Sequence, residues 1–207
     1  MKKLLHIIAT PRGEESRTLK VSNSFLKAFT ESHPDWKVEE LDLTKEKLPD
    51  LAVEQVNGKY LLLSGKELAG PSKAAWQDIL KHIQRFLSAD GYLLSTPMWN
   101  FSIPYRLKHY LDVIIQPKYL FQYTNTGVEG LIKNKKMVVV ASRGGDYGSA
   151  PLVRLDYQEP YLRSLFGFVG ITDIKFIIAQ PMDMGNELQE KRLQVAQGLA
   201  KEAAKNF

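Results

Sequence analysis

Residues 3–16 read KLLHIIATPRGEES, an apolar run followed by a polar loop. The run at 3–9 carries Ile7 and Ile8 and is closed by a Pro/Gly segment, which is typical of a buried parallel strand. From Ser16 onward the apolar residues recur at helical spacing, and Ser16 suits the N-cap position of that helix. A strand, a loop and the first turn of a helix therefore follow one another in that order.

The alternation of strands and helices continues through the rest of the chain. Further strands are predicted at 37–43, 91–95, 137–141 and 173–179, and further helices at 73–87, 103–115, 157–168 and 187–204. A polar, turn-rich insertion at 44–72 is expected to hold some helix and little core. An excursion at 117–132 contains a TNTG turn that indicates a hairpin. One domain over residues 1–207 is expected.

Strands that alternate with helices pair in parallel through right-handed crossovers. The sequence therefore predicts an α/β fold, a doubly wound five-stranded parallel sheet in the order 2-1-3-4-5 with helices on both faces. Such sheets bind ligands beyond the carboxyl ends of their strands, and for this order the crevice lies beside strands one and three. The loops expected to form the site are 10–18, 96–101 and 142–148.

The composition excludes several classes of protein. Hydrophobic residues make up 44% of the 207 residues and charged residues 25%, as in ordinary globular proteins. Cysteine is absent, which excludes disulfides, Cys-ligated metal centres and a thiol nucleophile. The net charge of +5 is spread along the chain, so no nucleic-acid surface is predicted. No apolar stretch approaches the roughly 18 residues that span a bilayer, so a cytoplasmic protein without a membrane segment is expected. No metal site is expected either.

The first loop collects donors for an anion at the start of a helix. Thr10, Ser16 and Thr18 supply hydroxyls, and Arg12 and Arg17 supply guanidinium groups. Unpaired amides and the helix dipole in a first turn favour negative charge, so this loop is a candidate phosphate site. It contains neither a Walker A motif nor the glycine spacing of a dinucleotide-binding loop. The alternative is a capped helix after a turn, with no ligand.

The second loop reads Pro97-Met98-Trp99-Asn100-Phe101 and follows the third predicted strand. Its large apolar side chains are unusual for a surface loop and suit the face of a flat ring. Asn100 can both donate and accept hydrogen bonds, as the polar edge of such a ring requires. A packed corner of the core is the alternative.

The third loop reads Ser142-Arg143-Gly144-Gly145-Asp146-Tyr147-Gly148. Its paired glycines would let backbone amides approach a ligand, or would permit a tight turn. Arg143 is a candidate for ligand binding, and the alternative is that it pairs with a carboxylate and holds the loop closed. All three loops fall at the crevice that the strand order predicts, which favours a ligand site over three unrelated turns.

Longer motifs resemble those of a known family. They are PMWNF at 97–101, IPYRLKHYLD at 103–112, FQYT at 121–124, GVEGL at 127–131, SRGG at 142–145 and FGFVGITD at 166–173. Together they are similar to the signature of the FMN-dependent NADH-azoreductases, a branch of the NAD(P)H:quinone oxidoreductases. The resemblance runs in order along the chain and leaves only 44–72 without a diagnostic motif. It implies a flavodoxin-like fold.

The resemblance also implies FMN as a tightly bound cofactor and NADH or NADPH as co-substrate, with two electrons passed to quinones and azo compounds in a ping-pong cycle. The FMN phosphate would be bound by Thr10, Ser16, Arg17 and Thr18. The isoalloxazine would be bound by residues of the other two loops, namely Pro97, Met98, Trp99, Asn100, Phe101, Ser142, Arg143, Gly144 and Gly145. Because the flavin carries the chemistry, no side chain and none of the four histidines is given a catalytic role.

The resemblance further implies a homodimer with the active site at the subunit interface. Candidate residues of the substrate pocket are Phe121, Tyr147, Phe166 and Phe168, and ordinary core is the alternative for the three phenylalanines. The loops depart from the family pattern in three places. Thr10-Pro11-Arg12 replaces consecutive serines, Trp99 stands where tyrosine is common, and Asp146-Tyr147 differs from a His-containing version. The physiological oxidant and the choice between NADH and NADPH therefore stay open.

Two other classes of function share this strand order. A flavodoxin-type electron carrier would bind FMN without a nicotinamide substrate, but such carriers are usually small and acidic, whereas this chain is longer and basic. A phosphoacceptor receiver domain needs clustered carboxylates after the first strand and an aspartate at the end of the third. Thr10-Pro11 and Thr96-Pro97 occupy those places. The electron carrier is the alternative that remains.

Overall fold

The centre of the structure is a five-stranded parallel sheet. The computed structural model describes residues 1–207 and orders the strands β2-β1-β3-β6-β7. Their bounds are Lys2–Ile8 for β1, Trp36–Asp42 for β2, Gly91–Pro97 for β3, Lys136–Ser142 for β6 and Asp173–Ala179 for β7. Counted among these five strands alone, the order is 2-1-3-4-5, as the sequence predicts. The carboxyl ends of β1 and β3 therefore flank the crevice of a doubly wound sheet.

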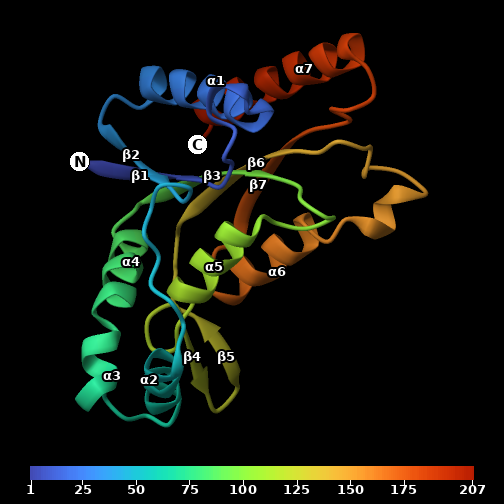
Figure 1. The fold of residues 1–207 in the computed structure, drawn as a ribbon. Helices are drawn as coiled ribbons and strands as arrows, with labels where there is room; N and C mark the ends of the chain where they lie inside the picture. Colours follow the sequence, from blue (N-terminus) through green and yellow to red (C-terminus); the bar gives the residue numbers. More distant parts are fainter.

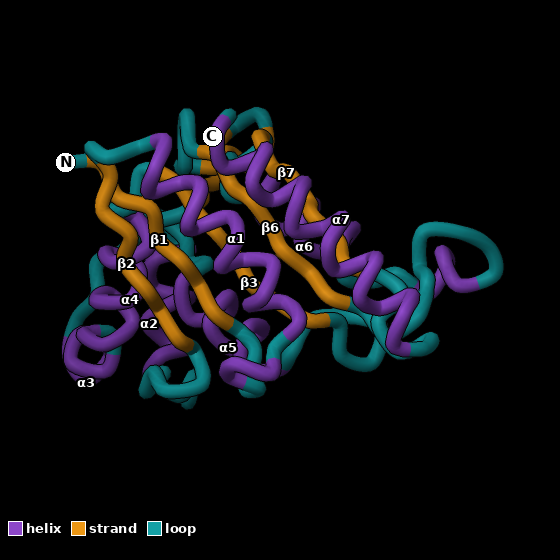
Figure 2. Tube along the Cα trace, turned by 90° about the horizontal axis from the view of Figure 1, so that it is seen from above, coloured by secondary structure: helices purple, strands orange, loops and turns teal.

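Helices lie against this sheet in two layers (Figure 1). The helices that pack on it are α1 (Arg17–Ser32), α4 (Gln77–Leu87), α5 (Tyr105–Ile114), α6 (Glu159–Phe168) and α7 (Asn186–Lys205). Helices α1 and α7 run side by side on one side of the sheet, as Figure 2 shows from above, and α4, α5 and α6 lie on the other. None of the helices is long and apolar enough to cross a membrane.

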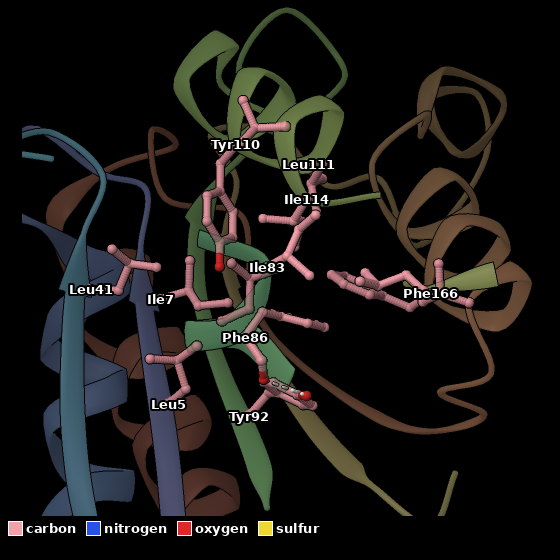
Figure 3. Close-up of a cluster of buried hydrophobic side chains, with 14 of the residues drawn as sticks. Leu5, Ile7, Leu41, Ile83, Phe86, Tyr92, Tyr110, Leu111, Ile114 and Phe166 are labelled. Carbon is pink, nitrogen blue, oxygen red and sulfur yellow. Dashed lines mark hydrogen bonds between the residues drawn. The ribbon is translucent and has the colours of Figure 1, made fainter. Parts of the chain in front are cut away.

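Each layer buries its own core. Successive residues of β1 point to opposite layers, because Leu4 belongs to the core under α1 and α7 while Leu5 and Ile7 belong to the core under α4 and α5 (Figure 3). A strand that is covered on both faces is apolar at most positions, which explains why His6 is the only polar residue between Leu4 and Ala9. The polar residues that follow each strand therefore lie in the loops at the carboxyl edge of the sheet.

The predicted helix at 73–87 is two helices, α3 (Gly70–Ala75) and α4, separated at Trp76. The Trp76 side chain is fully buried, and its Nε1 donates to the carbonyl oxygen of Gln55, 2.8 Å away in α2 (Val53–Leu63). A Cβ on Gly58 would overlap the indole, so α2 packs directly on this ring. The break lets the Trp76 ring pack against the insertion at 44–72. This insertion adds Leu48 and Leu62 to the core and is therefore better packed than the sequence indicates.

The excursion forms the hairpin that its turn predicts. Strands β4 (Phe121–Thr124) and β5 (Gly127–Gly130) pair antiparallel. The hairpin is anchored where Gly130 meets the backbone of Val169 and Gly170, beside a hydrogen bond of 2.9 Å from the amide of Ile132 to the carbonyl oxygen of Val169. This contact has no room for a side chain at position 130.

Replacing Gly130 with alanine is expected to lower the free energy of unfolding by about 2 kcal/mol, because the new Cβ overlaps backbone atoms that cannot rotate away. Urea denaturation measures this change. Gly167→Ala in α6 is the matched control, since nothing lies within 4 Å of a Cβ at that position. Equal stability of the Gly130 variant and the wild type would mean that the hairpin is not anchored at this contact.

Candidate functional site

The three candidate loops meet at the carboxyl edge of the sheet. The amide of Met98 donates to the carbonyl oxygen of Ser142 over 2.9 Å, which joins the second loop to the third. The hydroxyls of Thr18 and Ser142 lie 2.7 Å apart, which joins the first turn of α1 to the end of β6. A cavity of about 340 Å³ opens between the first and second loops, lined by Ala9, Pro11, Thr44, Trp99, Pro104, Tyr105 and Arg106. The folded chain thus gathers residues that are 124 positions apart in the sequence.

The hydroxyls of the first loop form hydrogen-bonded pairs. Ser16 is the N-cap of α1, and its Oγ accepts from the amide of Leu19. Thr10 Oγ1 lies 3.0 Å from Ser16 Oγ, and Thr18 Oγ1 is paired with Ser142 as described above. Each pair has two hydroxyl protons and uses one of them in its mutual bond. One proton in each pair is therefore left to donate to a ligand.

Two backbone amides in the first turn of α1 are also free. The N–H groups of Arg17 and Thr18 donate to no protein acceptor, whereas the next amide, that of Leu19, is taken by the Ser16 side chain. Free amides at the positive end of a helix dipole bind anions. Together with the spare hydroxyl protons they form a donor set that suits a phosphate group.

The arginines of the first loop are placed differently from the sequence-based assignment. The Arg17 guanidinium forms an ion pair with Asp183, which follows β7, and so ties α1 to the far side of the site. The side chains of Arg12, Glu14 and Glu15 are exposed. The positive charge of Arg17 is therefore already compensated, and the group that this residue leaves free for an anion is its backbone amide.

The second loop is a strained turn. Trp99 and Ser102 exchange two backbone hydrogen bonds of 2.9 Å, and the two residues between them, Asn100 and Phe101, have φ angles of 47° and 70°. This left-handed conformation costs about 1–2 kcal/mol for each non-glycine residue. The turn leaves the amides of Asn100 and Phe101 without protein acceptors and exposes the rings of Trp99 (39%) and Phe101 (43%). It is not a packed corner of the core, because both rings are exposed and Trp99 lines the cavity.

The third loop presents free backbone donors at its two glycines. The amides of Gly144 and Gly145 donate to no protein acceptor. A Cβ on Gly144 would overlap the carboxylate of Asp183, so this glycine makes room for the segment after β7. Across the crevice, the rings of Tyr147 and Phe101 lie 6.3 Å apart in an edge-to-face arrangement. The second and third loops therefore face one another with free amides on both.

Arg143 holds the third loop in place. Its side chain is buried, with Nη1 2.9 Å from the carboxylate of Asp156 and Nε donating to Gln158 Oε1 over 3.1 Å. The alternative role considered from the sequence, pairing with a carboxylate, is the one that the side chain performs. Only Nη2 lacks a hydrogen-bond partner.

Gln158 is a site residue that no sequence motif indicates. It is fully buried, and while its Oε1 accepts from Arg143, its Nε2 donates to the carbonyl oxygen of Pro97 over 2.9 Å. This single side chain bridges the second and third loops. Asp156 carried a weak signal, since an aspartate before a helix is a common cap, and its Oδ1 accepts from the amides of Gln158 and Glu159.

Gln158→Leu is expected to weaken, about tenfold, binding of the FMN that the sequence motifs imply, because it removes the bond to Pro97 and leaves the buried Nε of Arg143 without an acceptor. Fluorescence titration of the apoprotein measures the affinity. Gln197→Leu in α7 is the matched control, since it also removes a glutamine bond to a backbone carbonyl, that of Lys20, away from the three loops. If both variants bind FMN as the wild type does, the loops keep their positions without the bridge.

The four candidate pocket residues do not form one pocket. Phe166 is buried within the larger core (Figure 3), which is the alternative that the sequence left open for it. Phe121 and Phe168 have ring centroids 4.7 Å apart and line a groove of about 360 Å³ between α2, α5 and the hairpin. That groove shares no lining residue with the three loops, whereas Tyr147 lies beside Phe101. Within one chain, only Tyr147 adjoins the candidate cofactor site.

Comparison with known proteins identifies the family. A family model described as flavodoxin-like fold matches residues 2–203. Over 200 residues the chain is 37% identical to an FMN-dependent NADH:quinone oxidoreductase of Nitratidesulfovibrio vulgaris (strain DP4), which spans 95% of this chain and 96% of the relative. An azoreductase from Bacillus anthracis str. Sterne has a similar structure, with a TM-score of 0.92, 31% identity and coverage of 100% of both chains.

A third similar protein was solved with its cofactor. It is an FMN-dependent NADH-azoreductase from Bacillus anthracis str. Ames Ancestor in complex with FMN, with a TM-score of 0.88, 29% identity and coverage of 100% of this chain and 99% of the other. These matches span the whole chain, so the three loops lie inside the matched region. The resemblance in the sequence motifs is thereby confirmed, and the chain belongs to the family with this flavodoxin-like fold.

Proposed function

We propose that this protein binds FMN at the carboxyl edge of its sheet and passes two electrons from NAD(P)H to quinones and azo compounds. Relatives and structures that carry those activities or that cofactor in their names match it over nearly its full length. One observation of the chain itself carries the proposal: six backbone N–H groups without protein acceptors lie in the three loops, one of which also carries the exposed Trp99. They belong to Arg17, Thr18, Asn100, Phe101, Gly144 and Gly145.

The donor set fits the two ends of FMN. The amides of Arg17 and Thr18 would bind the phosphate, with the spare hydroxyl protons of the Thr10/Ser16 and Thr18/Ser142 pairs. The isoalloxazine would lie against Trp99, with its polar edge toward the glycine amides. Bound FMN would supply the acceptance of hydride from NAD(P)H and the delivery of two electrons to an oxidant. The chain would orient the ring, and its amide dipoles would stabilise negative charge on the reduced ring.

We also propose that the two substrates use the site in turn, in a ping-pong cycle. The cavity of about 340 Å³ beside Trp99 opens onto the expected position of the ring. NAD(P)H and an oxidant would both need this position to reach the same flavin atoms, so the first product must leave before the second substrate enters.

A homodimer would complete the site. Large apolar side chains are exposed on α2 and the hairpin, among them Val53 (71%), Tyr60 (66%) and Tyr123 (65%). Contiguous exposed apolar surface marks protein interfaces, and a second copy would cover it while closing the flavin pocket against water. Light scattering is expected to report two chains of 23.5 kDa. A particle of one chain with full activity would contradict a shared site.

The deciding experiment mixes the flavin-loaded protein with NADH in a stopped-flow instrument. Rapid bleaching of the flavin is expected, followed by recovery of the colour when a quinone is added. A flavin that NADH leaves oxidised, although a chemical reductant bleaches it, would contradict the proposal and support the electron-carrier alternative.

Removing the phosphate hydroxyls tests the first loop separately. Ser16→Ala combined with Thr18→Ala is expected to weaken the binding of FMN and to leave the binding of riboflavin, which lacks the phosphate, unchanged. Titrations of both flavins on the same apoprotein make the comparison. Equal FMN affinity in the variant and the wild type would remove the phosphate assignment from this loop.

A further inference from the structure

A chain of buried polar side chains lies directly beneath the first turn of α1. His6 Nε2 on β1 is 2.7 Å from Ser95 Oγ on β3, and Ser95 Oγ is 2.6 Å from Ser22 Oγ on α1. Ser22 Oγ in turn donates to the carbonyl oxygen of Thr18 over 3.1 Å. His6, Ser22 and Ser95 are each no more than 1% exposed, so no part of this chain is an ordinary surface contact.

The direction of every bond in the chain follows from its last member. A carbonyl oxygen can only accept, so the single proton of Ser22 goes to Thr18 and Ser95 must donate to Ser22. Ser95 then accepts from His6, which places the imidazole proton on Nε2. The other ring nitrogen, Nδ1, is buried without a hydrogen-bond partner, and a lone pair there costs less than an unpaired N–H would. The neutral Nε2–H tautomer is therefore the form that satisfies the chain.

The hydrogen-bonded series of His6, Ser95 and Ser22 places directional contacts, in place of apolar ones, beneath the first turn of α1. Apart from these bonds and the Thr18–Ser142 pair, the interface between α1 and the sheet contains apolar residues such as Leu4, Leu93 and Phe25. Apolar contacts are non-directional and allow a helix to slide, whereas a continuous series of hydrogen bonds fixes distances and angles. Together with the Thr18–Ser142 pair, the chain ties the first turn of α1 to β1, β3 and β6.

We propose that His6, Ser95 and Ser22 are positioning residues that fix the first turn of α1 for the phosphate of the ligand. They thereby set the preference of the site for a phosphorylated flavin over the same ring without a phosphate. The proposal rests on the proposed function, because it assigns the phosphate to this helix end. None of the three side chains would touch the ligand, so their effect passes through the amides of Arg17 and Thr18 and the Thr18 hydroxyl.

The test removes all three polar side chains together and compares the binding of two ligands. His6→Leu, Ser22→Ala and Ser95→Ala are combined, so that no polar partner stays buried alone, and apoprotein is titrated with FMN and with riboflavin. FMN affinity is expected to fall about tenfold, while riboflavin affinity stays unchanged. A merely structural role would move both affinities together. Ser24→Ala is the matched control, since this serine also donates to a carbonyl four residues earlier in α1 but lies outside the chain.

Each other outcome has a definite meaning. If both flavins bind the triple variant as they bind the wild type, or if both weaken by the same factor, the inference is overturned and the proposed function stands. If the wild type binds no FMN at all, both fall. Ser22→Ala alone keeps the bond between His6 and Ser95 and frees the Thr18 carbonyl. It is titrated in the same way if the triple variant does not fold, and unchanged FMN preference there also overturns the inference.

Discussion

Protein carrying Gly145→Val is expected to fold as the wild type does and to be recovered without FMN. Gly145 does not have a left-handed φ, and a Cβ there would meet only side-chain atoms of Leu152 and Tyr147, each 3.3 Å away. Those side chains can shift by the few tenths of an ångström required. Binding of the ligand is affected instead, because the branched side chain and the Tyr147 ring that it displaces would enter the space beside the free amide of Gly145, where the flavin ring is expected to lie. FMN affinity should fall at least about a hundredfold, or about 3 kcal/mol.

The measurement is a thermal melt and a flavin titration on the same sample. Gly198→Val, on the exposed side of α7 with nothing within 4 Å of its Cβ, is the control for introducing valine in place of glycine and should bind FMN normally. A lowered melting temperature with intact FMN affinity in the Gly145 variant would show that the loop only turns the chain. The ring would then have to bind elsewhere.

The free energy of unfolding is expected to drop steeply in mild acid because of His6. Burial lowers the pKa of His6 to about 4, from 6.5 when the ring is in water, and the carboxylate of Asp42 offsets this only in part. Between these two pH values the unfolded chain binds a proton that the folded chain excludes. The contribution of His6 is therefore complete above about pH 6.5 and is lost as the pH falls toward about 4. At about 1.36 kcal/mol per pKa unit the loss amounts to about 3 kcal/mol.

Urea denaturation across this pH range measures the effect. His6→Gln is the comparison, because an amide can still donate to Ser95 but does not titrate. Carboxylates such as Glu39, whose pKa is lowered by Lys3, also lose their contributions to the free energy of unfolding in acid. They do so in both the wild type and the His6→Gln variant. The difference between the two curves isolates His6. Parallel curves would mean that the buried imidazole is charged or has an acceptor for its second nitrogen.

The sheet order and the three loops follow from the sequence because their signals are local. Apolar runs such as that of β6 fill both faces of a covered strand, and the handedness of the crossovers leaves few ways to connect five of them. The N-cap role of Ser16 is also predictable from local sequence, since a serine before a helical pattern caps the helix whatever the helix packs against.

The features that the sequence does not predict depend on contacts between residues that no local sequence pattern connects. Trp76 divides a helix because its ring docks on Gly58, and the amphipathic pattern around it continues without interruption. Gln158 bridges two loops with an unremarkable polar side chain, so only the folded structure distinguishes it from a surface glutamine. Phe166 and Phe168 are two residues apart in one motif, yet the first is core and the second lines a groove. Residues two positions apart on a helix point to nearly opposite sides, so α6 directs the first toward the core and the second toward the groove.

The left-handed pair Asn100 and Phe101 sets a limit on engineering this protein for heat resistance. Glycine adopts such angles without strain, so replacing either residue with glycine would raise the stability of the apoprotein. Libraries screened by melting temperature alone would therefore enrich changes in the turn that we propose presents an aromatic ring and an amide to the flavin. Screens that retain colour as a second criterion would keep the turn, and their gains would have to come from surfaces remote from it, such as the outer face of α7.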